Sequence, residues 1–296
     1  MSTSSPADLE AARTLVERGL ADLFAVADSA LDRAWTWPDH GEADGRYAFF
    51  RILEDLEATA AAIDTGMTSR GPADAIVAPA TVARWDLIGT LVPLSASDLD
   101  ADPGGGEWTI RQTVAHIIAS QHSYGAYTAW YRDQGIRTGL QDLPTAPDDL
   151  GDPAFDEAIA ADGTPDEIRR RLHLALDGAA ARLADLSTDD LALTARWSGL
   201  QVTVGFRQGR WSSHIAEHTV QVDKTLVWLG RQPSEVERLI RLVAVAWGRL
   251  ESRVWPGATP SDQPSVVVDA ARRVAEIAAS VRATASTAST DGAAPG

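Results

Sequence analysis

Apolar residues recur at every third and fourth position over most of the chain, which is the period of an α-helix. The alternation of apolar and polar residues that is typical of a half-buried strand is nearly absent. We therefore expect an all-α protein. The periodic stretches predict helices over residues 9–35, 46–63, 76–91, 110–133, 164–186, 203–229, 235–255 and 265–282.

Three predicted helix starts carry a capping residue. Thr109 is followed three positions later by Gln112, and Thr164 by Glu167, which is the capping-box spacing at a helix N-terminus. Thr203 can cap the long helix that follows it. These starts fix the register of the helices that carry the candidate chemistry.

Stretches rich in Pro, Gly and Ser divide the chain into segments. Residues 1–73 predict an N-terminal helical hairpin, and residues 74–230 predict an up-and-down four-helix bundle. Residues 231–283 form a C-terminal helical extension, and residues 284–296, rich in Ala, Ser, Thr and Gly, are expected to be a disordered tail. The two helical pairs at the ends could pack together as a second, degenerate bundle.

Composition narrows the range of partners. The chain has 296 residues with 26 Lys+Arg against 42 Asp+Glu, a net charge of −16, so we expect no affinity for nucleic acid or an anionic membrane. No signal peptide or membrane span is predicted, and the expected location is the cytoplasm. A small-molecule substrate is the expected partner. A homodimer is also possible from the sequence, because the helices at the two ends of the chain could bury apolar faces between subunits.

Two histidines lie one helical turn apart. His214 and His218 form a His-x-x-x-His inside the predicted helix 203–229, so both imidazoles can reach one ion. The alternative is a solvated polar face, but the same face carries Trp211 and Trp228, which suits a lined cavity better. The pair is not a zincin signature, since Glu217 directly precedes the second histidine.

A third ligand is needed, and His116 is the candidate. It lies in the capped helix 110–133, on a stripe of small and polar residues. A lone histidine in such a place is more often hydrogen-bonded within a bundle than bound to metal. Beside a His-x-x-x-His, the metal-binding interpretation is favoured. Because the chain has no Cys, a metal must be held by His, Asp or Glu.

The segment Glu107-Trp108-Thr109-Ile110-Arg111 that leads to His116, followed about a hundred residues later by His214 to His218 and Gln221, resembles the DinB/YfiT-like superfamily. The resemblance covers residues 74–230, about half of the chain, and does not extend to either flank. It implies a four-helix bundle in which His116, His214 and His218 hold one divalent metal. Members include metal-dependent thiol S-transferases that use bacillithiol or mycothiol, and mycothiol-dependent maleylpyruvate isomerases.

The resemblance implies a metal-dependent transferase. Three neutral imidazoles leave a coordination position open, and a divalent ion lowers the pKa of a bound thiol or water toward neutrality. A chain without Cys must obtain its thiol from a cofactor such as mycothiol. The isomerases commonly carry an α/β C-terminal domain, whereas this C-terminus is predicted to be helical, which counts against that activity.

Five further residues are candidates for supporting roles. Glu217 could act as a base and Gln221 could hold a ligand, although a helix-surface carboxylate is an equally good interpretation of Glu217. Arg207 and Arg210 could grip a substrate carboxylate, or could face solvent. Tyr127 could reach the cavity, although a core aromatic is the more common role.

Two alternative functions stay open from the sequence. One is metal-assisted hydrolysis with water as the nucleophile. The other is a non-catalytic helical module for ligand binding or protein interaction. The identity of the metal is open as well, because three histidines can hold Zn, Ni, Fe, Co or Mn.

Overall fold

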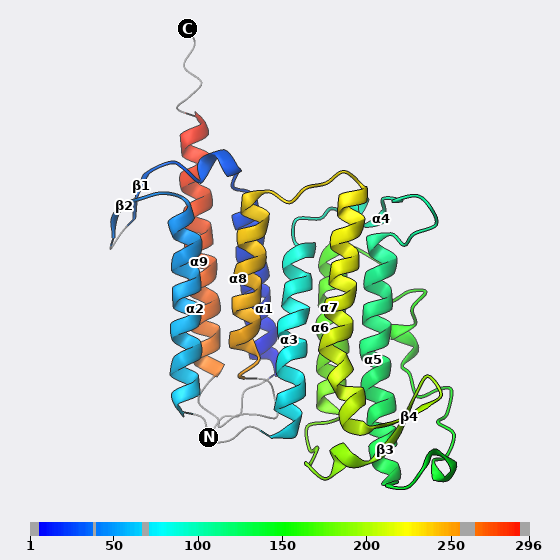
Figure 1. The fold of residues 1–296 in the computed structure, drawn as a ribbon. Helices are drawn as coiled ribbons and strands as arrows, with labels where there is room; N and C mark the ends of the chain where they lie inside the picture. Colours follow the sequence, from blue (N-terminus) through cyan, green and yellow to red (C-terminus); the bar gives the residue numbers. More distant parts are fainter. Residues whose placement is uncertain (1–5, 38–39, 67–70, 255–263, 291–296) are drawn as a thin grey trace.

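The computed structural model describes residues 6–37, 40–66, 71–254 and 264–290, and its helices dominate (Figure 1). This confirms the all-α class. The helices are α1 (Pro6–Phe24), α2 (Arg46–Gly66), α3 (Pro72–Leu91), α4 (Ala96–Asp100), α5 (Ile110–Gln134), α6 (Pro165–Ala181), α7 (Val204–Trp228), α8 (Glu235–Glu251) and α9 (Pro264–Thr290). Among the described residues, no helix combines the length and the apolar character that crossing a membrane requires.

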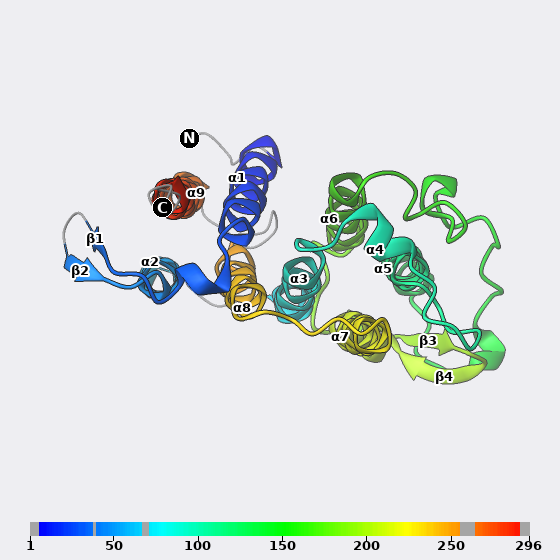
Figure 2. The ribbon, with the colours of Figure 1, turned by 90° about the horizontal axis from the view of Figure 1, so that it is seen from above.

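Helices α3, α5, α6 and α7 form one four-helix bundle. Seen from above, they occupy the corners of a square, in which α5 packs against α6 and α7, and α3 packs against the same two helices (Figure 2). All three histidines singled out above lie on two of these helices, α5 and α7.

Helices α1, α2, α8 and α9 form a second bundle beside the first (Figure 2). The two bundles meet where α8 runs antiparallel to α3, with Trp85 packed edge-on against Trp247. The helices approach closely because Gly89 has no side chain: a Cβ there would come within 2.8 Å of the Cα of Arg241. None of the four helices of the second bundle contains a histidine.

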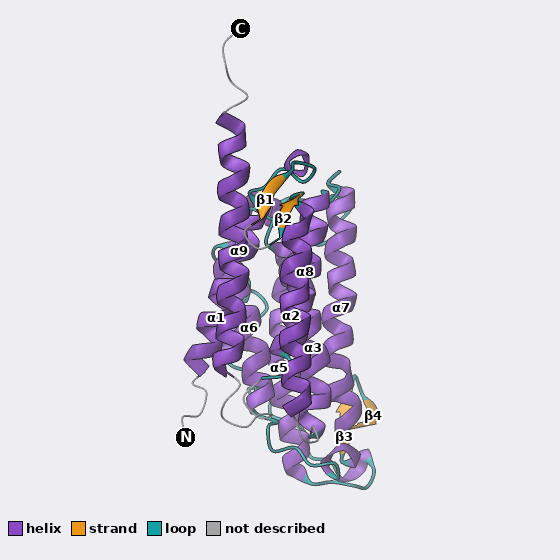
Figure 3. Cartoon of the chain, turned by 90° about the vertical axis from the view of Figure 1, so that its left-hand side faces the viewer, coloured by secondary structure: helices purple, strands orange, loops and turns teal. Residues whose placement is uncertain are grey.

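Two short β-hairpins interrupt the helical chain, and they lie at opposite ends of the molecule (Figure 3). Strands β1 (Trp35–Trp37) and β2 (Gly41–Ala43) connect α1 to α2, and strands β3 (Thr194–Trp197) and β4 (Leu200–Thr203) connect α6 to α7. Each bundle therefore contains a helix, a hairpin and a helix in succession: α6, β3–β4 and α7 in the first bundle, and α1, β1–β2 and α2 in the second. The helices α3 and α5 complete the first bundle, and α8 and α9 complete the second. By this order of elements, the second bundle is a circularly permuted version of the first.

The helix predicted over 9–35 is too long, because α1 ends at Phe24. Asp28 instead accepts the backbone N–H groups of Glu235 and Val236 at 2.8 and 3.0 Å, which satisfies free donors at the start of α8. A side chain that caps another helix cannot be inferred from local periodicity. At the other end, α9 runs to Thr290, past the expected start of a disordered tail at 284, and residues 291–296 lie outside the described part of the chain.

The predicted helix starts are confirmed. Thr109 and Thr164 each accept a hydrogen bond from the backbone N–H three positions on, and Gln112 and Glu167 complete the two capping boxes. Thr203 accepts the backbone N–H of Phe206 at 3.1 Å. The caps thereby set where α5, α6 and α7 begin.

Candidate metal centre

His116, His214 and His218 come together between α5 and α7. The rings of His116 and His218 are 4.8 Å apart between centroids, those of His116 and His214 are 5.2 Å apart, and those of the pair on α7 are 4.4 Å apart. One ring nitrogen from each residue lies within 4.8 Å of the others. Nitrogens around a tetrahedral zinc are about 3.3 Å apart, so small side-chain rotations bring all three onto one ion.

Two of the histidines are oriented by neighbouring side chains. Nδ1 of His116 lies 3.1 Å from a carboxylate oxygen of Glu157, and Nδ1 of His218 lies 2.8 Å from the amide oxygen of Gln221. Since both partners are acceptors, each Nδ1 carries the proton and donates it. The lone pair of each ring is then on Nε2, which is the tautomer that a ligating histidine needs.

His214 is the most buried of the three, with 6% of its surface exposed. Its Nδ1 is buried and has no hydrogen-bond partner among the described residues, and Tyr124 packs edge-on against the ring. Burial, reinforced by the nearby His218 and His116, lowers the pKa of His214 to about 3. Burial also lowers the pKa of His218. Both rings are therefore neutral at pH 7, with lone pairs available to a cation.

The orphaned nitrogen of His214 and the donor set fit a divalent transition metal. Three imidazoles make a site for Zn or a neighbouring metal, and they leave positions for water or a substrate atom. Among the described residues, His116, His214 and His218 form a group of His, Asp or Glu side chains that are close enough together to hold a metal ion.

A cavity of about 450 Å³ lies next to the site: none of the three histidines lines it, but Trp108 and Glu157, which both contact His116, do. Trp108, which lies just before the Thr109 cap, packs against the His116 ring at 5.3 Å and also lines this cavity with Glu157. Arg111 lines it too, but its guanidinium donates to Asp100 and to the carbonyl oxygens of Ala161 and Gly163. Arg111 thus ties the connection before α6 to the start of α5.

Glu217 and Arg210 bind each other. The Nη1 and Nη2 atoms of Arg210 each donate to a carboxylate oxygen of Glu217 at 2.9 Å, and this hydrogen bonding lowers the pKa of Glu217. The carboxylate is a weaker base for being paired, and the guanidinium is neutralised. Gln221, in contrast, is part of the site, through His218.

Arg207 lies two turns before His214 and is 7% exposed. Its Nε donates to the hydroxyl of Thr128, and Nη1 donates to the carbonyl oxygen of Arg196 at 2.5 Å. The guanidinium also lies 5.1 Å from the centroids of the Tyr131 and Trp197 rings, and burial lowers its pKa. These contacts hold the β3–β4 hairpin against α5.

Tyr127 points to the long connection between α5 and α6, where its hydroxyl donates to the carbonyl oxygen of Pro147 at 3.4 Å. His122 is buried: its Nε2 accepts the backbone N–H of Asp152, and its ring stacks on Phe155. His173 is buried where α6 faces α1, and His40 packs near Tyr47. None of these histidines joins the three-histidine group.

Sequence reasoning missed Glu157. It belongs to the irregular segment between α5 and α6, just after a 3₁₀ turn at Pro153–Phe155. No motif marks a single carboxylate in such a segment. Only its distance from His116 identifies it.

Residues 80–222 match the family model of the DinB superfamily, and the matched segment contains all three histidines. This part of the chain belongs to the DinB superfamily. The DinB segment covers α5, α6 and most of α3 and α7, while α1, α2, α8 and α9 lie outside it. Comparisons with curated proteins and with solved structures found no match.

Proposed function

We propose that this DinB protein is a metal-dependent enzyme that transfers a low-molecular-weight thiol, such as mycothiol, to a small electrophile. The observation that supports the proposal most is the set of three imidazoles brought together between α5 and α7, two of them oriented by Glu157 and Gln221. A structural site would fill every coordination position with protein ligands, whereas three histidines leave room for a reactant.

His116, His214 and His218 would hold the metal. A divalent ion at this place supplies a lowered pKa for a thiol or water that binds beside it. Glu157 and Gln221 keep the Nε2 lone pairs of His116 and His218 directed inward, so they act as positioning residues.

We assign the role of nucleophile to a thiol rather than to water. Two carboxylates of the site are already engaged, because Glu157 accepts from His116 and Glu217 accepts from Arg210, so the ionisation of a water nucleophile would depend on the ion alone. A free thiol, with a pKa of about 8.5, is far more acidic than free water, at about 15.7, so it needs much less help from the ion. In an addition, the sulfur forms a bond to carbon and the thiol proton passes to the neighbouring carbon; in a displacement, the leaving group departs with its electron pair and the proton goes to solvent.

The electrophile would occupy the cavity of about 450 Å³ beside His116. Trp108 offers an aromatic wall there. In this proposal Arg207 stabilises the β3–β4 hairpin and Tyr127 stabilises the α5–α6 connection. Arg210 forms an ion pair with Glu217 and does not contact the substrate.

The test is consumption of mycothiol and of monobromobimane, an electrophile that becomes fluorescent when a thiol displaces its bromide. Zinc-loaded protein should accelerate the reaction over the uncatalysed background, and His218→Ala should return it to background. His40→Ala, which alters an exposed histidine outside the site, should behave as wild type. Equal rates with and without protein, for mycothiol and for bacillithiol, would contradict thiol transfer. Loss of the electrophile without added thiol would instead indicate metal-assisted hydrolysis.

A further inference from the structure

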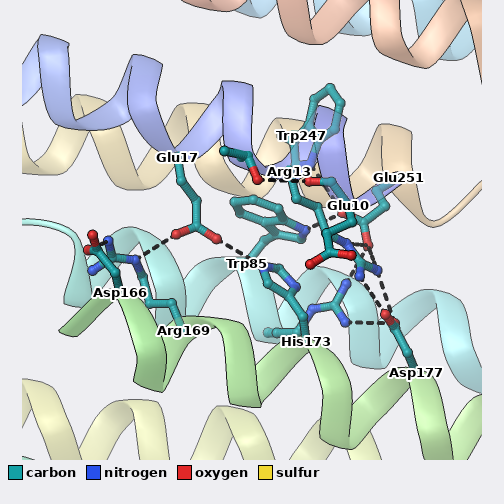
Figure 4. Close-up of polar contacts among 12 residues, drawn as sticks. Glu10, Arg13, Glu17, Trp85, Asp166, Arg169, His173, Asp177, Trp247 and Glu251 are labelled. Carbon is teal, nitrogen blue, oxygen red and sulfur yellow. Dashed lines mark hydrogen bonds and ion pairs between the residues drawn. The ribbon is translucent and has the colours of Figure 1, made fainter. Parts of the chain in front are cut away.

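A second cavity, of about 630 Å³, lies between α1 and α6, where the two bundles face each other. None of the residues that line it lines the cavity beside His116. Side chains of α1 and α6 line it, and Figure 4 shows how they contact polar side chains of α3 and α8 behind them. The DinB match gives it no role, because α1 and α8 lie outside the matched residues.

The floor of the cavity, Arg13 and Asp177, belongs to an internally neutralised group of four charged residues. Glu251 accepts from Arg13 and Arg84 and from the indole N–H groups of Trp85 and Trp247 (Figure 4). Asp177 accepts from the same two arginines, at 3.0 Å from Arg13 Nη2 and 3.2 Å from Arg84 Nη1. Two guanidiniums balance two carboxylates, so the floor has no charge left for a ligand.

The inner wall is also paired. Glu17 accepts from Arg169 at 2.8 Å and from the Nε2 of His173 at 2.9 Å. Burial, together with the nearby Arg84 and Arg13, lowers the pKa of His173 well below its usual value, so the ring is neutral. Arg169 also donates to Asp166, so the carboxylates of Glu17 and Asp166 share one guanidinium.

Two unpaired guanidiniums remain at the rim. The pairs Arg13–Asp177 and Glu17–His173 show that α1 and α6 run antiparallel. Arg18 follows Glu17 on α1, and Arg170 follows Arg169 on α6, the residue that pairs with Glu17. The two arginines therefore lie at similar heights along the two helices, on opposite sides of the cavity that both of them line. Both are exposed, and within the described ranges neither makes a hydrogen bond or an ion pair.

Apolar surface adjoins this pair. Leu174, one turn after Arg170, is 45% exposed and lines the cavity, as does Ala21 one turn after Arg18. Glu10, also on the lining, lies about 12 Å before Arg18 along α1. Asp166, one turn before Arg170, lines the cavity too, but its carboxylate accepts from Arg169. One end of the cavity therefore combines an apolar wall with two guanidiniums that make no hydrogen bond among the described residues, in a protein whose net charge is −16.

We propose that this cavity binds a small amphipathic organic anion, with its carboxylate between Arg18 and Arg170 and its apolar part along Leu174 and Ala21. Guanidiniums bind carboxylates through charge-assisted hydrogen bonds, and two of them facing each other can hold both oxygens. The site is separate from the metal centre and does not depend on it.

The experiment measures 1-anilinonaphthalene-8-sulfonate fluorescence with the full-length His116→Ala protein free of metal, so that the result is independent of the proposed reaction. We expect one saturable equivalent of the dye, displaced by octanoate and not by the neutral octanamide. The double variant Arg18→Ala/Arg170→Ala should bind at least tenfold more weakly. The control Arg137→Ala/Arg249→Ala, which removes two exposed arginines elsewhere, should bind as tightly as the parent.

Three results would each overturn the proposal: absence of saturable binding, equal affinity of the double variant and its parent, or displacement by octanamide as effective as by octanoate. Circular dichroism establishes that the variants are folded. If the double variant is not folded, Arg170→Gln, which keeps a polar side chain but removes the charge, should still weaken binding several-fold, and unchanged binding would reject the site.

Discussion

Replacing Glu251 by Gln should destabilise the protein strongly. Glu251 is 1% exposed and accepts hydrogen bonds from Arg13, Arg84, Trp85 and Trp247, which come from α1, α3 and α8. Gln keeps the shape but removes the charge, so the two buried guanidiniums are left with a single carboxylate, that of Asp177. Removing one member of a buried ion pair costs about 3–5 kcal/mol, because the partner charge stays buried without compensation.

The assay is urea unfolding of the metal-free protein, followed by tryptophan fluorescence. The control is Asp86→Asn, which breaks the ion pair between Asp86 on α3 and Arg241 on α8. The side chain of Asp86 is 30% exposed and that of Arg241 is 32% exposed. Solvent screens this pair, so the control should lose clearly less stability than Glu251→Gln. A Glu251→Gln variant within about 1 kcal/mol of wild type would refute the claim that the two guanidiniums stay buried without compensation.

Three other predictions follow from the geometry. Glu157→Gln should weaken zinc binding about 10- to 100-fold in a competitive chelator titration, because the partner that fixes the His116 ring becomes neutral, and unchanged affinity would deny it a positioning role. The folded pKa of His173 lies below the unfolded value of 6.5, so its contribution to stability is present above pH 6.5 and is lost as the pH falls. Urea unfolding of metal-free protein at pH 7.5 and 5.5 should show that His173→Gln loses about 1.4 kcal/mol less than wild type over this interval, and parallel losses would contradict a neutral buried ring. Gly125→Ala should lower the free energy of unfolding by about 1–3 kcal/mol, because the new Cβ would come within 2.4 Å of the Cβ of Ala179. Gly178→Ala on α6 has open space around it and should raise the free energy of unfolding by about 0.5–1 kcal/mol. Equal effects of the two substitutions would show that α5 and α6 can move apart freely.

Much of the fold follows from local patterns. The period of the apolar residues predicts the long helices, and the side chains of Thr109, Thr164 and Thr203 predict where α5, α6 and α7 begin, because a cap involves residues only three positions apart. The His-x-x-x-His spacing places two rings on one face of α7 by helix geometry alone. The position of His116 opposite them was implied by family resemblance, and the structure brings the three rings together.

Other features depend on contacts between residues far apart in the sequence. Glu157 reaches His116 from an irregular segment that no periodicity describes. Arg13 and Glu251 are 238 positions apart, and in the sequence each is indistinguishable from a surface charge on an amphipathic helix. Arg207 could equally have faced solvent or substrate, and its environment is decided by the hairpin that folds over it. Tertiary packing determines these roles.

The most direct test of the metal centre is a calorimetric titration of chelator-treated protein with zinc. Wild type and His40→Ala should each bind one ion per chain. Burial lowers the pKa values of His214 and His218, so these two ligands should release few protons to the buffer near pH 7 and more as the pH falls. His116→Ala should lose most of this affinity, because two histidines on one helix do not complete a three-ligand site. Absence of stoichiometric binding in the wild type, or equal affinity in His116→Ala, would contradict the account.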